Sequence, residues 1–301
     1  MIHTKQAQYR TYVVGAPLSE AGETPRAMYW DMDDPYHYAR IAPGGRAGEE
    51  FLIVGGEDHK TGQQGDPAQA RWDRLEAWAR ERFAGFGRVS YRWSGQVVGT
   101  NDGLAFIGRN PGDARNVFIA TGDCGHGMTH GTIAGLLLPA LIAGRRHPWE
   151  ALYDPSRVRA GAVGRWAREN LNAAAQYGRH LRPGEAASVD DVAPGTGAVV
   201  RRGLSEIAVY RDADGSVVER SAICPHLGAV VCWNSAEKTW DCPAHGSRFA
   251  TDGTVLNGPA AAGLAETKAP RPARAVRKRR APARKRASGR RAPPRFGRKT
   301  A

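Results

Sequence analysis

A chain of 301 residues, 41% of them hydrophobic, is long enough to form about two domains with buried cores. Its longest apolar run, residues 133–144, has 12 residues and contains Pro139, whereas a membrane-spanning helix needs roughly 20. The N-terminus has no apolar segment typical of a signal peptide, so we expect a cytoplasmic protein with no membrane partner.

The net charge of +13 comes entirely from one end of the chain. Residues 268–301 hold 15 of the 43 Lys and Arg and none of the 30 Asp and Glu. A segment with so few large apolar residues is expected to be disordered. It either attaches the protein to nucleic acid through phosphate contacts, or is a solvated extension without a partner, including an out-of-frame end of the coding sequence.

The first elements along the chain predict an α+β region. Residues 10–18 ("RTYVVGAPL") and 49–59 ("EEFLIVGGEDH") are typical of strands. Residues 66–83 predict a helix with its cap at Asp66, because Trp72, Leu75, Trp78 and Ala79 fall on one helical face.

Residues 115–145 predict a strand, a glycine-rich turn and a helix in that order. Gly122, Gly125, Gly127 and Gly131 would let a ligand approach the backbone closely. A helix that starts at such a turn offers free N–H groups and the positive end of its dipole to an anion or an electron-rich ring. Tight turns also need glycine, so this pattern alone is a weak indication of a cofactor.

The wider context resembles the glycine/D-amino acid oxidase superfamily of FAD-dependent oxidoreductases. The resemblance rests on "YRWSGQVVGTNDGLAFIGR", "NVFIATGDCGHGMTHGTIAGLLL" and "GRRHPWEALYDPSR", within residues 10–157. It implies FAD, a small amine substrate and cofactor contacts at Trp93, Asp102, Gly125, His126, Gly127 and Met128. Ala105 stands where the family commonly has proline.

That family also has a Gly-x-Gly-x-x-Gly turn that holds the FAD pyrophosphate. The nearest string in this chain, residues 195–203, has its third glycine in the wrong place. We therefore expect residues 1–158 to be the C-terminal part of such an oxidoreductase, unable to hold FAD alone. Its partner would be a redox protein or the missing FAD-binding segment.

A helical linker, residues 159–184, is predicted to lead to a small β domain at residues 185–266. Residues 197–202, 205–212 and 216–222 are typical of short strands, and Asp214-Gly215 marks a hairpin between the last two. The basic tail would then begin at residue 267.

Near the end of this β domain lie two short loops rich in metal ligands. The spacing is Cys224-x-His226, 15 residues, then Cys242-x-x-His245. Zinc accepts two thiolates and two imidazoles, but zinc fingers usually pair Cys with Cys and His with His on separate arms. One Cys and one His on each arm suits a [2Fe–2S] cluster in which the cysteines hold one iron and the histidines hold the other.

The surrounding residues, "CPHLG", "CPAHGSRF" and "DGTVLNGPA", resemble the Rieske domain. The resemblance implies that Cys224 and Cys242 hold the inner iron, and that His226 and His245 hold the outer, redox-active iron. Ser247 matches a serine that bonds a bridging sulfide in high-potential members, but Phe249 replaces their tyrosine. We therefore expect a low or intermediate reduction potential.

The remaining cysteines have no assigned chemistry in this pattern. Many Rieske domains carry a disulfide at the positions of Ala229 and Ala244, so both of its halves are absent here together. Cys232 and Cys124 are interpreted as small packing residues. The sequence thus predicts an α+β chain in which a partial FAD-oxidoreductase region precedes a small all-β Rieske domain that transfers electrons. The alternative is a non-catalytic nucleic-acid-associated protein that acts through its tail.

Overall fold

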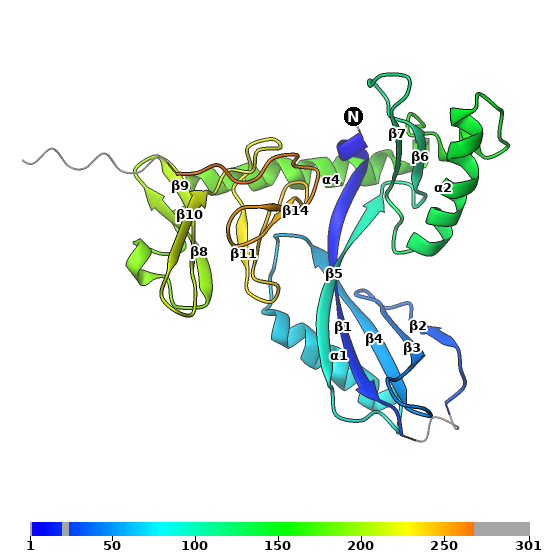
Figure 1. Cartoon of the computed structure of the whole chain (residues 1–301), viewed down its shortest axis with the longest axis horizontal. Helices are drawn as coiled ribbons and strands as arrows, with labels where there is room; N and C mark the ends of the chain where they lie inside the picture. Colours follow the sequence, from blue (N-terminus) through cyan, green and yellow to red (C-terminus); the bar gives the residue numbers. More distant parts are fainter. Residues whose placement is uncertain (1, 20–23, 268–301) are drawn as a thin grey trace, which may run out of the picture. The chain divides into compact units, whose positions relative to one another are not determined.

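The N-terminal part is built on a five-stranded antiparallel sheet in which two long strands flank a third. In a computed structural model that describes residues 2–19 and 24–267, the strand order is β2-β3-β4-β1-β5 (Figure 1). The strands of this sheet are β1 (Gln6–Pro17), β2 (Met28–Trp30), β3 (His37–Pro43), β4 (Glu50–Lys60) and β5 (Tyr91–Thr100). The predicted strands at residues 10–18 and 49–59 are confirmed as β1 and β4.

Helix α1 (Ala68–Arg82) packs on β1 and β4, and it buries the predicted face at Leu75 and Ala79. The predicted cap at Asp66 is wrong. The N-cap residue is Pro67, whose side chain has no oxygen to accept a hydrogen bond from the helix N–H groups. The Asp66 carboxylate instead pairs with Arg74 at 3.2 Å.

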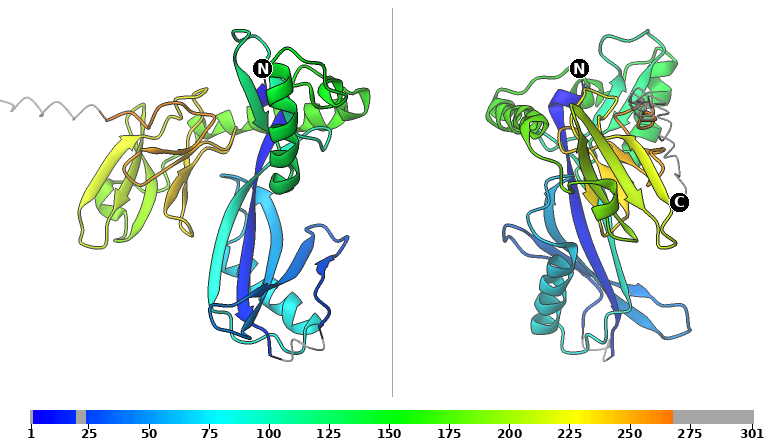
Figure 2. Two further views of the ribbon diagram at one scale, coloured as in Figure 1. Left: turned by 45° about the vertical axis from the view of Figure 1, so that its right-hand side comes forward. Right: turned by 90° about the vertical axis from the view of Figure 1, so that its left-hand side faces the viewer.

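The strand, turn and helix predicted within residues 115–145 are confirmed. Strands β6 (Phe106–Arg109) and β7 (Phe118–Thr121) form a two-stranded antiparallel ladder. Helix α2 (Gly127–Ile142) packs its Leu137 and Leu141 on this ladder, and the short helix α3 (Glu150–Tyr153) packs there as well. Figure 2 shows α2 and this ladder from two further directions.

The predicted helical linker forms a nearly continuous helical stretch. It comprises the 3₁₀ turn η2 (Ala160–Ala162), helix α4 (Val163–Ala175) and the 3₁₀ segment η3 (Gln176–Leu181). None of its residues is fully buried, so polar contacts hold it in place. The carboxylate of Glu169 accepts hydrogen bonds from the Tyr9 hydroxyl at 2.9 Å and from the Lys60 ammonium.

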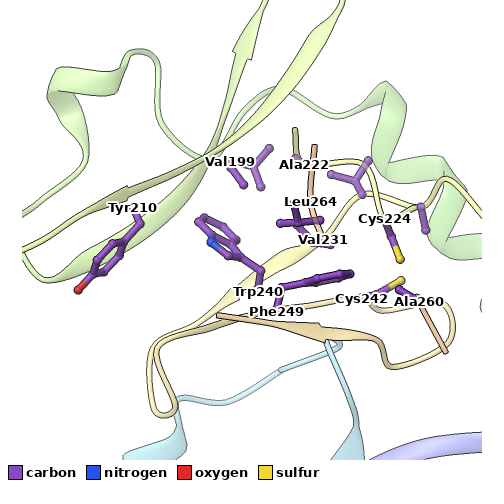
Figure 3. Close-up of a cluster of buried hydrophobic side chains, with 13 residues drawn as sticks. Val199, Tyr210, Ala222, Cys224, Val231, Trp240, Cys242, Phe249, Ala260 and Leu264 are labelled. Atoms are coloured by element: carbon purple, nitrogen blue, oxygen red, sulfur yellow. The ribbon is translucent and has the colours of Figure 1, made fainter. Parts of the chain in front are cut away.

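The region after the linker consists of two small antiparallel sheets. The predicted strands are confirmed as β8, β9 and β10, with a hairpin turn at Gly215, whose φ is +90°. A four-stranded sheet follows, and Trp240 and Phe249 lie fully buried in the core that it shares with β8 and β9 (Figure 3). The elements are η4 (Val189–Asp191), β8 (Thr196–Arg202), β9 (Ser205–Arg211), β10 (Val217–Ser221), β11 (Cys232–Asn234), β12 (Thr239–Asp241), β13 (Arg248–Phe249) and β14 (Val255–Asn257).

These helices and sheets make an α+β fold, as predicted. Residues up to Thr267 pack as one compact unit. Within the described residues, every helix is too short or too polar to cross a membrane. The predicted disordered tail lies outside the described residues, and with it the proposed nucleic-acid contact.

Candidate metal centre and flavin face

Two loops of matching backbone geometry carry the four predicted ligands. In the first, the Cys224 N–H donates to the Ala229 carbonyl at 2.9 Å and the Gly228 N–H donates to the Cys224 carbonyl at 2.9 Å. In the second, Cys242, Gly246 and Ser247 repeat this pattern at 2.7 and 2.9 Å. Each loop turns at a glycine with positive φ, +83° and +71°, a conformation that favours glycine.

The two loops bring the thiols of Cys224 and Cys242 together at the end of the apolar core (Figure 3). Both side chains are buried, and they share a hydrogen bond. This bond, helped by the N–H groups of His226 and Leu227, lowers the pKa of the Cys224 thiol to about 6, and it raises the pKa of Cys242 well above its usual value. The site therefore stabilises a thiolate, the form that binds iron, at Cys224.

The imidazoles of His226 and His245 lie edge to face, with ring centroids 5.0 Å apart. Burial lowers the pKa of both, that of His245 to about 4, so at neutral pH both rings are uncharged and have a nitrogen lone pair to offer. Nδ1 of His226 is buried and has no hydrogen-bond partner. A buried, unpaired imidazole nitrogen is costly on its own and fits a metal ligand.

The spread of these ligands distinguishes a single ion from a cluster. A tetrahedral zinc ion, bound at about 2.0 to 2.3 Å, would bring its ligand atoms within roughly 4 Å of one another. Among the described residues, the one group of three or more potential ligand atoms within 4.8 Å of one another is Asp31, Asp33 and His37. The Cys224, His226, Cys242 and His245 set is therefore too widely spaced for one ion, and it suits a larger group with thiolates on one side and imidazoles on the other.

Neighbouring residues complete the polar environment of the thiols. The Ser247 hydroxyl, which is fully buried, accepts the Ala260 N–H at 3.0 Å and is close enough to hydrogen-bond with Cys224. All four cysteines are free. The interpretation of Cys232 as a packing residue is confirmed: it is buried in β11, and burial raises the pKa of its thiol to about 12.

The predicted flavin contacts from Gly125 to Met128 lie together at the start of α2. The turn uses positive φ at Gly122, Cys124 and Gly125, and helix α2 begins at Gly127. Met128 is 89% exposed, and the same side of the helix exposes Leu136 and Ile142. An uncharged helix with exposed large apolar residues is typical of a surface that another element covers.

Of the other two predicted flavin contacts, Asp102 lies near the glycine turn and Trp93 lies away from it. Asp102 is near the glycine turn, because Thr100 contacts both Asp102 and Cys124. Its carboxylate forms a two-pronged pair with Arg157 at 2.7 and 2.8 Å, which keeps its pKa below the usual value although burial opposes ionisation. Trp93 is seven residues before Thr100 on β5, roughly 23 Å along the strand. It lines a separate cavity of about 280 Å³, so the structure does not bring Trp93 to the turn.

One neighbour of the candidate metal centre has no signal in the sequence. His3, in the 3₁₀ turn η1 (Ile2–Lys5), packs against both His226 and His245, with ring centroids 4.9 and 5.4 Å away. More than 200 residues separate His3 from these two rings, so no local spacing could have predicted the contact.

Comparisons with known proteins match two stretches of the chain to two families. A family model described as FAD dependent oxidoreductase matches residues 2–141, and one described as Rieske [2Fe-2S] domain matches residues 183–268. The fold and the paired loops define an iron–sulfur protein of the Rieske class. The chain belongs to the Rieske [2Fe–2S] family and carries, ahead of that domain, a region of the FAD-dependent oxidoreductase family. The Rieske domain implies a [2Fe–2S] cluster, and the FAD-dependent oxidoreductase region implies FAD.

Relatives match one or both parts. The Rieske 2Fe-2S iron-sulfur protein YhfW of Bacillus subtilis (strain 168) is 33% identical over 255 residues, which are 83% of this chain and 48% of that protein. This chain thus spans about half the length of that relative. A cytochrome b6-f complex iron-sulfur subunit of Prochlorococcus marinus (strain NATL1A) is 32% identical over 46% of this chain and 72% of its own length. A glycine oxidase structure from Geobacillus kaustophilus aligns with 52% of this chain and 40% of its own, at 17% identity and a TM-score of 0.41.

Proposed function

We propose that this chain transfers single electrons in an FAD-dependent amine oxidoreductase system. The observation that carries the proposal is the pairing of the two thiols and two imidazoles beside a region of the FAD-dependent oxidoreductase family. When bound, the flavin would supply two-electron chemistry at the carbon next to an amine, and the cluster would take those electrons one at a time, with an external one-electron acceptor reoxidising it between transfers.

We assign Cys224 and Cys242 to the inner iron, and His226 and His245 to the outer iron. The buried thiols, the N–H groups that face them and the unpaired Nδ1 of His226 support this assignment. The Ser247 hydroxyl, whose oxygen accepts the Ala260 N–H and which lies within hydrogen-bonding reach of Cys224, would donate its proton toward the sulfurs. The Rieske domain core encloses the thiol side and excludes water from it.

The glycine turn and the N-terminus of α2 would lie against the flavin ring. These residues provide backbone N–H groups and a helix dipole, but no Gly-x-Gly-x-x-Gly turn for the pyrophosphate. We therefore propose that FAD binds only when a dinucleotide-binding segment covers the exposed face at Met128, Leu136 and Ile142. A cytoplasmic location is part of the same proposal.

Cofactor analysis of the purified full chain tests the proposal. We expect two irons and two acid-labile sulfides per chain, a Rieske-type EPR spectrum after reduction, and little or no FAD. One zinc per chain without labile sulfide would contradict the cluster, and stoichiometric FAD would contradict the incomplete flavin site.

Two matched cysteine variants test the ligand assignment. Cys242→Ala should abolish the EPR spectrum, because it removes one of two thiolates from the inner iron. Cys232→Ala, which also removes a buried thiol, should retain the spectrum and lose about 1 kcal/mol of unfolding free energy to the small cavity. Loss of the spectrum in both variants would contradict the assignment.

A further inference from the structure

His3 is a third imidazole at the histidine side of the candidate metal centre. Its ring stands nearly perpendicular to those of His226 and His245, at 88° and 80°. The centroid distances of 4.9 and 5.4 Å lie within the range of favourable edge-to-face contacts. It touches both rings at once, so a change in the orientation of either ring would disturb this contact.

The residues that follow His3 are anchored to several other parts of the chain. The Lys5 ammonium donates to the carbonyls of Pro155 and Arg157, each at 2.9 Å. The Asn170 side chain in α4 donates to the Thr4 carbonyl at 2.9 Å, and the Asn101 N–H donates to the Lys5 carbonyl at 3.0 Å. His3 therefore projects from a fixed backbone.

The second cluster loop packs directly on the sheet of the FAD-oxidoreductase-like region. The Gln96 side chain donates to the Gly246 carbonyl at 2.7 Å, and the Gln63 side chain donates to the Pro243 carbonyl at 2.9 Å. A Cβ atom on Gly246 would lie 2.4 Å from Cβ of Gln8, so the contact is too close for any larger residue. The space left beside His245 is a polar cavity of about 20 Å³, enough for about one water molecule.

The same N-terminal segment reaches the glycine turn. Gln6, three residues after His3, accepts a hydrogen bond from the Thr121 hydroxyl at 3.3 Å. A Cβ atom on Gly122 would lie 3.5 Å from Oε1 of Gln6. Residues 3–8 therefore contact the candidate flavin face at one point and the candidate metal centre at two others.

We propose that His3 is a positioning residue for the two histidine ligands of the cluster. Its ring holds the rings of His226 and His245 edge to face and keeps water from their outer side. That outer side then faces the FAD-oxidoreductase-like region, and an external partner does not reach it. The external electron acceptor would then approach another face of the Rieske domain. This inference rests on the proposed function, because it concerns the cluster that the proposed function requires.

The role of His3 can be tested with three variants of the tag-free full chain. Each variant is measured by EPR and by redox titration of the cluster, without flavin or substrate. His3→Ala removes the ring and admits water, which stabilises the more negative reduced cluster. We expect a higher reduction potential and altered g values. His3→Phe keeps an edge-to-face ring and should restore the g values of the unchanged chain. His147→Ala is the control, since His147 packs on Trp149 instead and should change neither property.

The outcomes separate this inference from the proposed function. A chain without any Rieske-type spectrum would contradict the proposed function itself. A normal spectrum in the unchanged chain, with the same potential and g values in His3→Ala, would contradict only the role of His3. Loss of the cluster from His3→Ala alone would support that role, whereas its loss from both His3 variants would contradict a role based on ring packing.

Discussion

Ser247 and Phe249, just before and within strand β13, differ in what they can offer to the candidate cluster. Ser247 has a hydroxyl that accepts the Ala260 N–H and can donate its proton to the Cys224 sulfur. Phe249 is fully buried and has no polar atom to offer. Hydrogen bonds to the sulfurs stabilise the reduced cluster. By resemblance, high-potential Rieske domains have two such donors, a serine and a tyrosine, and only the serine is present here.

Ser247→Ala should therefore lower the reduction potential. A hydrogen bond to a charged group contributes about 1.5 kcal/mol, which corresponds to roughly 60 mV for one electron. Redox titration followed by EPR measures the shift. Ser216→Ala, an exposed serine in the same domain, is the matched control. An unchanged potential in Ser247→Ala would show that its hydroxyl does not reach the cluster.

His59, which is not one of the candidate ligands, illustrates a different effect of burial. Its ring lies between the Tyr12 hydroxyl, 3.1 Å from Nε2, and the Lys60 carbonyl, 2.8 Å from Nδ1, and burial lowers its pKa to about 4. Between pH 6.5 and pH 4 the unfolded chain binds a proton at this residue and the folded chain does not. His59 therefore makes the fold less stable as the pH falls through this range.

His59→Gln should reduce this loss of stability on acidification. The contribution is at most about 1.4 kcal/mol per pH unit, the slope for one proton. Urea unfolding at pH 7 and pH 5 measures the difference between the chain and the variant. The same comparison at pH 8 and pH 7 is the internal control, where the difference should stay constant. An equal loss between pH 7 and pH 5 in both proteins would contradict the prediction.

At the scale of secondary-structure elements, the linker connects the two regions through polar contacts. Helix α4 has no buried residue, yet the Glu169 carboxylate accepts hydrogen bonds from Tyr9 and Lys60. Asn172 forms a hydrogen bond with Gln63. Further along, Tyr177 donates to the Leu227 carbonyl at 2.8 Å. The linker thus contacts the first sheet at one end and the first cluster loop at the other.

Glu169→Ala should weaken the attachment of the linker. It leaves the Lys60 ammonium and the Tyr9 hydroxyl without their shared acceptor in a largely buried position, and we expect a loss of about 1 to 3 kcal/mol in unfolding free energy. Urea unfolding measures this loss. Glu150→Ala, an exposed residue of α3, should change stability by less than about 0.5 kcal/mol. A similar small change at Glu169 would show that α4 is held by other contacts.

At the scale of the whole described unit, the long strand β1, which lies between β4 and β5, connects the candidate sites. Gln6 contacts the glycine turn, Gln8 packs on Gly246, and the fully buried Arg10 pairs with Glu237 at 3.3 Å. Ser94 of the neighbouring strand β5 donates to the same Glu237 carboxylate. The Rieske domain is therefore joined to the first sheet by several direct contacts in addition to the linker.

The sequence by itself determined the class of each region. Apolar runs and the Asp214-Gly215 turn are local signals, and they predicted β1, β4, β7 and β8 to β10. The shorter strands, such as β2 and β11 to β14, were not predicted from the sequence. The two Cys and His pairs lie within 22 residues, and the backbone of two short loops brings them together. For this reason the four candidate ligands of the metal centre could be predicted from the sequence alone.

Only the tertiary structure decided what surrounds that centre. Contacts such as His3 with His226, Gln96 with Gly246 and Arg10 with Glu237 join residues that are more than 100 positions apart, and spacing along the chain carries no information about them. Asp66 is a local exception to the sequence prediction: its carboxylate pairs with the Arg74 guanidinium, eight residues away, and does not cap the helix. Ligand chemistry is local because it depends on residue type and loop geometry, whereas the position of the cluster depends on how distant surfaces pack.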